Sequence, residues 1–395
     1  MSEKPAILGG KPVFEKMVPI IRPSIDRYTD DPLLKEIKEI LKSNMVSGVN
    51  NYVRKLEKAV SEYIGVKNAL SLSSCTSGLM LSIQALGMRN KEVLVPSFTF
   101  SATAHSAYWN NCKIKFVDCD PETFNISIDD VQEKITDKTA GILPVHLFGN
   151  PCDVKALREI TEDRDLKIIY DSAHALGSVH DGKKVGQFGD VEIFSASPTK
   201  LISTMEGGIL TTNNDELAKT IEVTRNYGNN PDYTCKIPGL SARMPEINAA
   251  LGLYMLKDID TFVKNRNEHA RRYKQKLSGI NGLKYQKISE NSVSAYKDFA
   301  IVIDEDKFGL SRDAVCDALS KENVMTKKYF YPPIHMLEAY RIFATEELPN
   351  TEYLSRNIVC LPMHNFMDAD LIDKICLAIK RIYENAEEAK SWLAR

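Results

Sequence analysis

The sequence predicts an α/β protein with a mostly parallel seven-stranded sheet flanked by helices, followed by a smaller C-terminal α+β domain. From Asn68 onward, short apolar or β-branched runs alternate with helical patterns, and the seven runs lie at residues 68–73, 92–96, 114–118, 141–145, 166–170, 191–196 and 208–212. Strands separated by helices of this length form βαβ units, whose sheet is covered on both faces. After Pro245 strands and helices alternate in a different rhythm, which indicates a second domain.

The other elements follow in chain order. Residues 1–30 carry few periodic signals and are expected to form an N-terminal arm. Residues 31–64 have apolar positions at helical spacing, with a Ser47-Gly48 turn that separates two expected helices. We expect the large domain to span residues 31–250. One continuous helical pattern from Ile247 to Leu277 then predicts a bridging helix that leads into the small domain. We expect the bridging helix and the small domain together to cover residues 251–395.

The composition is that of a globular protein without a strong charge imbalance. Hydrophobic residues make up 43% of the 395 residues, and the formal net charge is −2. Because no extended Lys/Arg run is present, we expect no nucleic-acid partner and no acidic membrane surface as a partner. The N-terminus lacks a basic segment followed by an apolar core, and no apolar run approaches the length of a membrane span, so we expect a cytoplasmic location.

The eight cysteines are scattered and form no CxxC pair. We therefore expect neither a metal site nor a disulfide framework. Small apolar residues in a reducing compartment have this pattern.

Two candidate binding features follow early strands of the predicted sheet, at the edge where open α/β sheets bind ligands. The stretch SSCTSGL, Ser73 to Leu79, opens a helix, and its backbone N–H groups and hydroxyls offer a place for a phosphate. An ordinary helix cap explains the same residues equally well. Phe100, in VPSFTFSAT, could lie flat against an aromatic cofactor, although a lone aromatic residue is more often part of the core.

Two further features follow later strands. Asp171 ends the most apolar strand and His174 follows it, so the carboxylate needs a cation or a donor unless it only caps a helix. The apolar run from Val191 to Phe194 ends in Ser195, and Lys200 follows in a loop. A lysine whose pKa is lowered by burial or by neighbouring cations can form a Schiff base with a carbonyl substrate or with pyridoxal phosphate. Together the features describe one pyridoxal phosphate pocket, in which an Asp keeps the pyridinium nitrogen protonated.

The chain resembles the sugar aminotransferases of the DegT/DnrJ/EryC1/StrS group, which are fold-type I pyridoxal phosphate enzymes. The resemblance extends over nearly the whole chain and rests on the motifs ILGGKPVF, VPSFTFSATAHSAYW, PVHLFGNPCDV, DSAHALGS, FSASPTKLISTMEGG, ARMPEINAALGL and LPMHNF. It implies a homodimer with a shared active site and the cofactor pyridoxal 5′-phosphate. It also implies a role for each candidate residue.

By this resemblance, Lys200 carries the Schiff base and Asp171 pairs with the pyridine nitrogen. Phe100 stacks on the ring, His174 lies near its phenolic oxygen, and the phosphate is held by Cys75, Thr76 and Ser195. Relatives with His at the lysine position are dehydratases, so Lys200 favours transamination. Where relatives often have an Asn that reaches the partner's phosphate, this chain has the shorter Ser241, which puts that contact in question.

The substrate is predicted from the stretch VMTKKYFYPPIHMLEAY. The cations Lys327 and Lys328 could bind a diphosphate, and the aromatic rings of Tyr329, Phe330 and Tyr331 could bind a sugar or a base. A strand with solvated lysines and core aromatics is the alternative. Together with PSFTFSATAHSAYW and VDCDPETFN, the stretch resembles the branch that aminates C4 of nucleotide-diphosphate 4-keto-6-deoxy sugars, with glutamate as donor. Amination at C3, a keto-inositol substrate, and another lysine-dependent reaction such as elimination or dehydration remain alternatives.

Overall fold

The computed structural model describes residues 4–393 except residues 24, 30, 231 and 233. Its main sheet has seven strands in the order β1 (Asn68–Leu72), β9 (Gly208–Thr212), β8 (Val191–Ser195), β5 (Lys167–Asp171), β4 (Thr139–Ile142), β2 (Glu92–Pro96) and β3 (Lys113–Val117). Only β9 runs antiparallel to its neighbours. The predicted mostly parallel seven-stranded sheet is therefore confirmed, and all seven predicted runs coincide with its strands to within a few residues.

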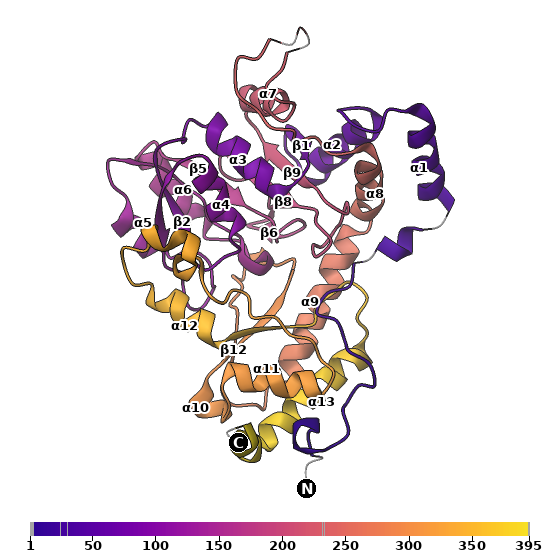
Figure 1. The fold of residues 1–395 in the computed structure, drawn as a ribbon, viewed down its shortest axis with the longest axis vertical. Coiled ribbons are helices and arrows are strands. Elements are labelled where there is room, and N and C mark those ends of the chain that lie inside the picture. The colour runs from indigo at the N-terminus through magenta and orange to yellow at the C-terminus, as the bar shows by residue number, and fades with distance from the viewer. Residues whose placement is uncertain (1–3, 24, 30, 231, 233, 394–395) are drawn as a thin grey trace.

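Helices cover both faces of this sheet (Figure 1). Apolar side chains alternate between the faces, because Val93 and Val95 pack with the cluster around α3 and α4, whereas Leu94 packs on the opposite side. The covering helices are α2 (Asn51–Ile64), α3 (Cys75–Ala85), α4 (Ala102–Trp109), α5 (Ile128–Lys134), α6 (Val154–Asp163), α7 (Asp215–Thr224) and α8 (Glu246–Leu256). Burial on both faces explains why the strand sequences read as continuous apolar runs.

The segment before the sheet forms α1 (Asp31–Ser43) and α2, as the Ser47-Gly48 turn predicts. The expected N-terminal arm carries two short 3-10 helices, η1 (Ala6–Leu8) and η2 (Ile25–Tyr28). It is packed against the C-terminal part of the chain, because Glu322 accepts hydrogen bonds of 2.7 Å from the backbone N–H groups of Ala6 and Val13. Residues 1–3, 24 and 30 of the predicted arm lie outside the described residues.

The predicted single bridging helix is wrong in one respect. The pattern from Ile247 to Leu277 divides into α8 and α9 (Ile259–Lys276), with Lys257 and Asp258 between them. The two helices serve different cores, since α8 packs against α2 and α9 packs against α13 (Ala369–Glu384). Periodicity alone could not reveal the change in direction because both halves keep helical spacing.

A second core lies in the C-terminal part of the chain, below the main sheet in Figure 1. A three-stranded antiparallel sheet, in the order β10 (Leu283–Tyr285), β12 (Phe299–Ile303) and β13 (Ile358–Leu361), packs against helices. The helices of this part, beside α9 and α13, are α10 (Glu305–Phe308), α11 (Arg312–Lys321), α12 (Pro349–Asn357) and α14 (Ala386–Leu393). Short 3-10 turns, η3 (Leu147–Gly149), η4 (Ile334–Met336) and η5 (Glu338–Phe343), and a small sheet of β6 (Val179–His180), β7 (Lys183–Lys184) and β11 (Ser292–Val293) complete the fold.

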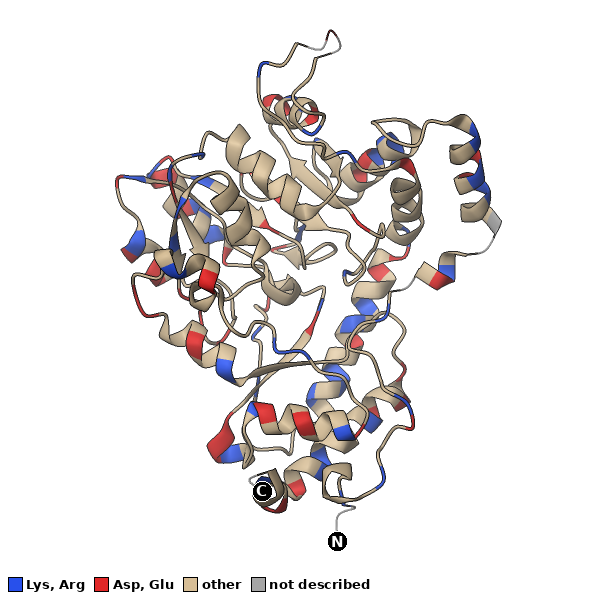
Figure 2. Ribbon diagram, in the orientation of Figure 1, with Lys and Arg blue, Asp and Glu red and all other residues tan. Residues whose placement is uncertain are grey.

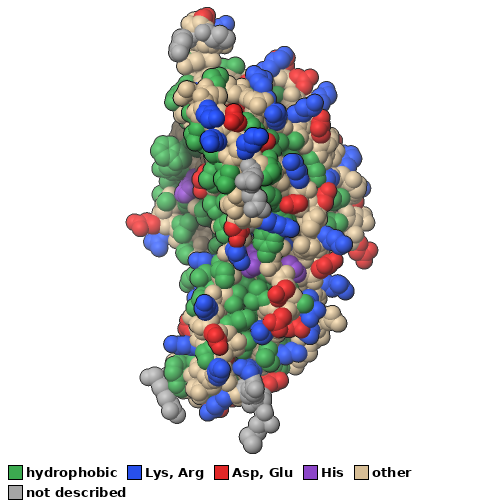
Figure 3. Space-filling model, turned by 90° about the vertical axis from the view of Figure 1, so that its right-hand side faces the viewer, with side chains coloured by type: hydrophobic (Ala, Val, Ile, Leu, Met, Phe, Trp, Pro, Cys, Tyr) green, Lys and Arg blue, Asp and Glu red, His purple; other side chains and the backbone are tan. Residues whose placement is uncertain are grey.

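The charged residues and the cysteines are spread over the structure without forming a single-sign surface or a disulfide among the described residues. Lys and Arg are interspersed with Asp and Glu along the outer helices (Figure 2), and both signs are mixed on the face shown in Figure 3. All eight cysteines are free thiols, and seven of them are buried, Cys235 being exposed. Within the described residues, no helix is both long enough and apolar enough to cross a membrane.

Candidate active site

A cavity of about 360 Å³ lies where the carboxyl ends of β5 and β8 meet the N-terminus of α3. The predicted site residues that line it are Cys75, Thr76, Phe100, Asp171, His174, Ser195, Lys200 and Tyr329. The topology explains this gathering, because parallel strands place their carboxyl ends at one edge of the sheet. Residues separated by more than 250 positions in the chain therefore share one cavity.

Lys200 lies in the loop between β8 and β9, and the loop turns through Pro198. The backbone N–H of Lys200 donates to the carbonyl of Ser197 at 3.0 Å, which closes a tight turn. The pKa of Lys200 is lowered to about 8, mainly by burial and also by the positive charge of Lys297, whereas Asp298, Cys75 and Asp171 oppose the shift. Roughly a tenth of the amine is then unprotonated at pH 7, against less than about one part in a thousand at its ordinary pKa.

Asp171 is the last residue of β5, and its side chain is buried. Burial raises the pKa of the carboxyl group, whereas hydrogen bonds from the Thr103 hydroxyl and the Ala173 N–H lower it. The Thr103 oxygen lies 2.7 Å from Oδ2, and the Ala173 nitrogen lies 3.1 Å from Oδ1. A buried carboxylate at a cavity wall is suited to meet a cationic N–H of a ligand, because such a partner offsets the cost of its burial.

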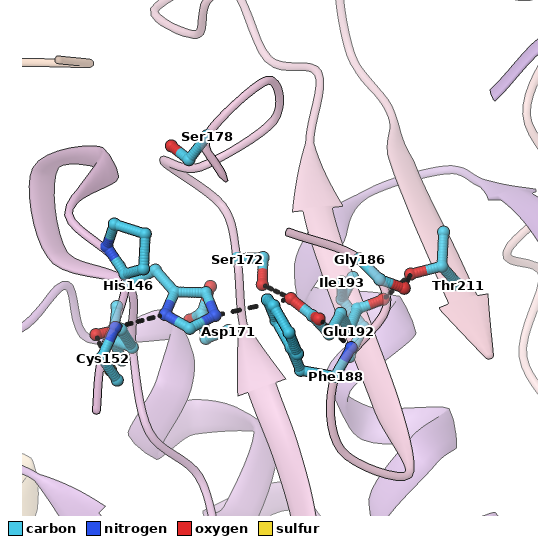
Figure 4. A network of polar contacts seen from close by, with 12 residues as sticks. His146, Cys152, Asp171, Ser172, Ser178, Gly186, Phe188, Glu192, Ile193 and Thr211 are labelled. Carbon is cyan, nitrogen blue, oxygen red and sulfur yellow. Dashed lines mark hydrogen bonds and ion pairs between the residues drawn. The ribbon is translucent and has the colours of Figure 1, made fainter. Parts of the chain in front are cut away.

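The strand of Asp171 is fixed by a buried polar network (Figure 4). The Ser172 hydroxyl donates to Oε2 of Glu192 at 2.7 Å, and Nε2 of His146 lies 3.5 Å from the same oxygen. Nδ1 of His146 accepts the backbone N–H of Cys152 at 2.9 Å. Because Glu192 lies on β8, these contacts join the two strands that carry Asp171 and Ser195.

The N-terminus of α3 forms one wall of the cavity. Ser74 caps the helix, since its hydroxyl accepts the N–H of Ser77 at 3.1 Å. The N–H groups of the first turn have no partner within the helix and carry the positive end of its dipole. Gly208 lets β9 begin against this turn, because a Cβ there would lie 2.5 Å from the Ser74 carbonyl carbon and 2.6 Å from the Cys75 nitrogen.

His174 and Phe100 lie on other walls of the cavity. Nδ1 of His174 accepts the backbone N–H of Phe148 at 3.1 Å, so the proton of the neutral ring is on Nε2. Burial lowers the pKa of His174 well below its usual value, and the charges of Lys200 and Lys297 add to this effect, so the ring stays neutral. Phe100 is 58% exposed and is therefore not a core residue.

Two residues that act on Lys200 and Asp171 carried no prediction from the sequence. Lys297 lines the cavity although it is only 3% exposed, and its Nζ lies 2.9 Å from each carboxylate oxygen of Asp298. The sequence signal for Lys297 was the Lys-Asp pair directly before the apolar run FAIVI. Charged residues are seldom buried unless they are paired, so such a pair at the start of a buried strand indicates a specific role. Thr103 is the other, and nothing in its sequence context distinguishes it from a neighbouring helix threonine.

Four predicted residues do not line the cavity. Lys327 is exposed and pairs through its backbone with Cys360, and Nζ of Lys328 lies 2.6 Å from Asp313. Tyr331 is exposed, with Arg312 over its ring. The predicted diphosphate role of the two lysines therefore lacks a place in this cavity, because the Lys327 side chain is exposed and the Lys328 ammonium group pairs with Asp313.

Ser241 is the fourth of these residues. It is exposed and forms a backbone bridge with Asn226. The described residues between these two positions belong to the projecting segment, which extends from the main body at the top of Figure 1. The predicted reach of Ser241 toward a partner subunit stays a prediction.

Comparison with known proteins places this geometry among sugar aminotransferases. The sequence model of the DegT/DnrJ/EryC1/StrS aminotransferase family matches residues 28–380. The chain is 37% identical over 330 residues to dTDP-4-amino-4,6-dideoxy-D-glucose transaminase of Shigella dysenteriae, covering 83% of this chain and 89% of the relative. It is 32% identical over 371 residues to GDP-perosamine synthase of Caulobacter vibrioides, covering 92% and 98%.

Solved structures agree with these sequence matches. The crystal structure of DesI in the presence of its TDP-sugar product superposes with a TM-score of 0.91 at 31% identity, covering 100% of this chain and 99% of DesI. PseC of Helicobacter pylori, an aminotransferase involved in pseudaminic acid biosynthesis, superposes with a TM-score of 0.85 at 25% identity, covering 94% and 100%.

Proposed function

The chain belongs to the DegT/DnrJ/EryC1/StrS aminotransferase family, and we propose that it moves the amino group of glutamate to C4 of a nucleotide-diphosphate 4-keto-6-deoxy sugar. The cofactor of the reaction is pyridoxal 5′-phosphate. The single observation that carries the proposal is the cavity that joins a lysine of lowered pKa, a buried aspartate and a helix N-terminus. The relatives support the sugar substrate, since the names of two of them contain a nucleotide-linked amino sugar.

The residues of the cavity fit this cofactor. Its phosphate needs an anion site, which the first turn of α3 and the close approach of Gly208 provide. Its ring nitrogen needs a carboxylate, and Asp171 is a buried carboxylate already oriented by two donors. Its aldehyde needs an amine, and Lys200 is the lysine of the cavity whose pKa is lowered to about 8.

When bound, pyridoxal phosphate supplies an electron sink and a carrier for the amino group. Lys200 would act as the base that takes a proton from the α-carbon of the amino donor, because its amine titrates close to neutral pH. The same Nζ would return that proton to the cofactor side of the reaction. In the second half of the cycle Lys200 would move the proton in the opposite direction, toward C4 of the sugar.

The other wall residues would hold and orient rather than transfer protons. Asp171 would keep the ring nitrogen protonated, and the Thr103 hydroxyl would hold its carboxylate in place. Nε2–H of His174 would donate toward the phenolic oxygen. Phe100 would cover one face of the ring and exclude water from it. Ser195 would add a hydroxyl donor to the phosphate, together with the first turn of α3 around Thr76.

The sugar substrate would enter past Tyr329 and Phe330, the aromatic residues of the cavity that come from the C-terminal part of the chain. Lys297 offers a cationic donor at this wall, since two of its three N–H groups face Asp298 and one remains. Lys327 and Lys328 would act outside the cavity, on the diphosphate or nucleotide that extends from it. Reversing both to Glu should raise the KM for the sugar nucleotide and leave the glutamate half-reaction unchanged.

The proposal includes a homodimer. Tyr108 and Trp109 on α4 are 50% and 72% exposed, and Tyr227 and Ile237 of the projecting segment are also exposed. Large apolar side chains gathered outside a core are typical of protein interfaces. In a dimer the projecting segment could bring Ser241 to the partner's site. A monomer in solution with full activity would refute this part of the proposal.

The substrate is tested by amine formation with a panel of ketones. We expect a 4-amino product from a nucleotide-diphosphate 4-keto-6-deoxy sugar and glutamate, detected by mass spectrometry of the sugar nucleotide. The control ketones are a nucleotide 3-keto sugar and a free keto-inositol. Efficient amination of either control in place of the 4-keto sugar would overturn the assignment of C4.

A further inference from the structure

Arg266 is a buried cation that the reaction described above does not use. It lies on α9, is 2% exposed, and donates from Nε to Oδ1 of Asn365 at 2.7 Å. Its Nη1 donates to the carbonyl oxygens of Tyr296 and Lys297 at 2.9 and 3.0 Å. These three acceptors are neutral. Burial lowers the pKa of Arg266 to about 10, so the guanidinium keeps its charge at neutral pH.

Asn365 extends this contact to the loop of Lys200. Its side-chain Nδ2 donates to the carbonyl oxygen of Leu201 at 3.1 Å, and Leu201 directly follows Lys200. Asn365 is 4% exposed and Leu201 is 3% exposed, so the contact is shielded from water. Arg266 and Asn365 therefore connect the backbone next to Lys200 to the backbone of Lys297.

Lys297 is also held from the opposite side. Its backbone N–H donates to the carbonyl of Phe148 at 2.9 Å, and its Nζ is fixed by Asp298. With the N–H and the side chain of Lys297 fixed in this way, the Arg266 contact to its carbonyl completes the restraint on this residue. The two lysines line the same cavity, and the charge of Lys297 acts on the amine of Lys200.

We propose that Arg266 and Asn365 are positioning residues that clamp the Leu201 carbonyl to the Lys297 backbone and so fix the spacing of the two cavity lysines. This inference rests on the proposed function, in which Lys200 acts as the base. A guanidinium suits the task because its rigid fork presents several N–H groups at once to acceptors on different segments. None of the three acceptors of Arg266 is a carboxylate, and the charge of Asp298 offsets only part of the effect of burial. Holding two segments around a reacting lysine gives this buried charge a use.

The test measures the reactivity of the Lys200 amine in the full-length, cofactor-free protein. Lys200 is labelled with acetic anhydride between about pH 6 and pH 11, and the labelled fraction is followed by peptide mass spectrometry. In Asn365→Ala, which changes no charge, we expect the apparent pKa of Lys200 to rise by about half a unit or more, because the spacing of the two cations relaxes. Arg266→Lys keeps a positive charge but loses the fork, and the same shift is expected.

The matched control is Asn110→Ala. Asn110 is a buried amide that donates to the carbonyls of Met80 and Ser106 at 3.0 and 2.9 Å, far along the chain from the clamp. It should lose stability in the way Asn365→Ala does and leave the Lys200 pKa at the wild-type value. If the apparent pKa of Lys200 were the same in Asn365→Ala as in Asn110→Ala, the proposed clamp would be overturned.

The loaded enzyme supplies the second measurement. In Asn365→Ala the kcat should fall about tenfold with a smaller change in the KM for the sugar nucleotide, since the clamp touches no substrate. If Arg266→Lys does not fold, Asn365→Ala still decides the result. Because the labelling uses cofactor-free protein, it remains informative if the ketone panel fails, so failure of the clamp and failure of the proposed reaction are distinguishable.

Discussion

The Thr103 hydroxyl donates a hydrogen bond of 2.7 Å to the Asp171 carboxylate, so a residue of α4 holds the acid at the end of β5. Thr103→Val removes this donor at nearly constant volume. We expect the rate of amine transfer to fall roughly 10- to 100-fold, the loss typical of one hydrogen bond to a charged group. Thr103→Ser keeps the hydroxyl and serves as the control. If the Thr103→Val and Thr103→Ser variants had equal activity, the Thr103 hydroxyl would have no role in the reaction.

Asp171→Ala should reduce the rate by several orders of magnitude, because the ring nitrogen of the cofactor loses the carboxylate that keeps it protonated. The phosphate wall at α3 is untouched, so cofactor retention should change less than the rate. Asp171→Asn should be nearly as poor. Steady-state kinetics together with the absorbance of bound cofactor measure both quantities, and near-normal turnover in either variant would reduce Asp171 to a structural residue.

Lys297→Met should shift the acid limb of the kcat profile to higher pH. Burial and the charge of Lys297 lower the pKa of Lys200, and Asp298 raises it, so removal of Lys297 leaves burial as the main lowering influence and the pKa rises. The pKa of the base then rises above about 8, and activity at neutral pH falls because less of the amine is unprotonated. Lys287→Met, which only removes an exposed pair with Glu122, is the control. A profile unchanged from wild type would contradict the assignment.

Gly208→Ala tests the anion wall. The added Cβ would lie 2.5 Å from the Ser74 carbonyl carbon and oxygen, so α3 and β9 must separate. We expect a loss of roughly 1–3 kcal/mol in the free energy of unfolding and weaker retention of pyridoxal phosphate. Gly279→Ala is the matched control, since its Cβ would meet nothing within 4 Å. Chemical denaturation and equilibrium dialysis give the two values, and tight cofactor binding in Gly208→Ala would exclude this wall as the phosphate site.

Much of the fold was predictable because its signals are local. The strands of the main sheet are apolar on both faces, and each therefore stands out in the sequence as a short run, such as the run 92–96 that became β2. The division between α8 and α9 was not predictable, because it depends on which core each helix packs against. Lys200, Asp171 and Phe100 follow such runs and match family motifs, and all three line the cavity. Their roles toward the cofactor stay predictions.

The C-terminal contribution to the site could not be read from the sequence. The backbone of Lys297 is held at the cavity by hydrogen bonds to Arg266 and Phe148, which lie far from it in the chain. The adjacent lysines at positions 327 and 328 gave a stronger sequence signal, yet the pairing of Lys328 with Asp313 directs its side chain away. Lys327 and Lys328 therefore lie outside the cavity that Lys297 lines, and their role toward the diphosphate stays a prediction.

The most direct test of the account is amine transfer from glutamate to a nucleotide-diphosphate 4-keto-6-deoxy sugar, measured in wild type and in Lys200→Ala. Wild type should form one 2-oxoglutarate for each 4-amino sugar. Lys200→Ala should fold with an unchanged melting profile and form neither, and borohydride reduction of the loaded wild-type enzyme should leave the cofactor label on Lys200. Amine transfer that persists in Lys200→Ala, or a label on another lysine, would contradict the central claim.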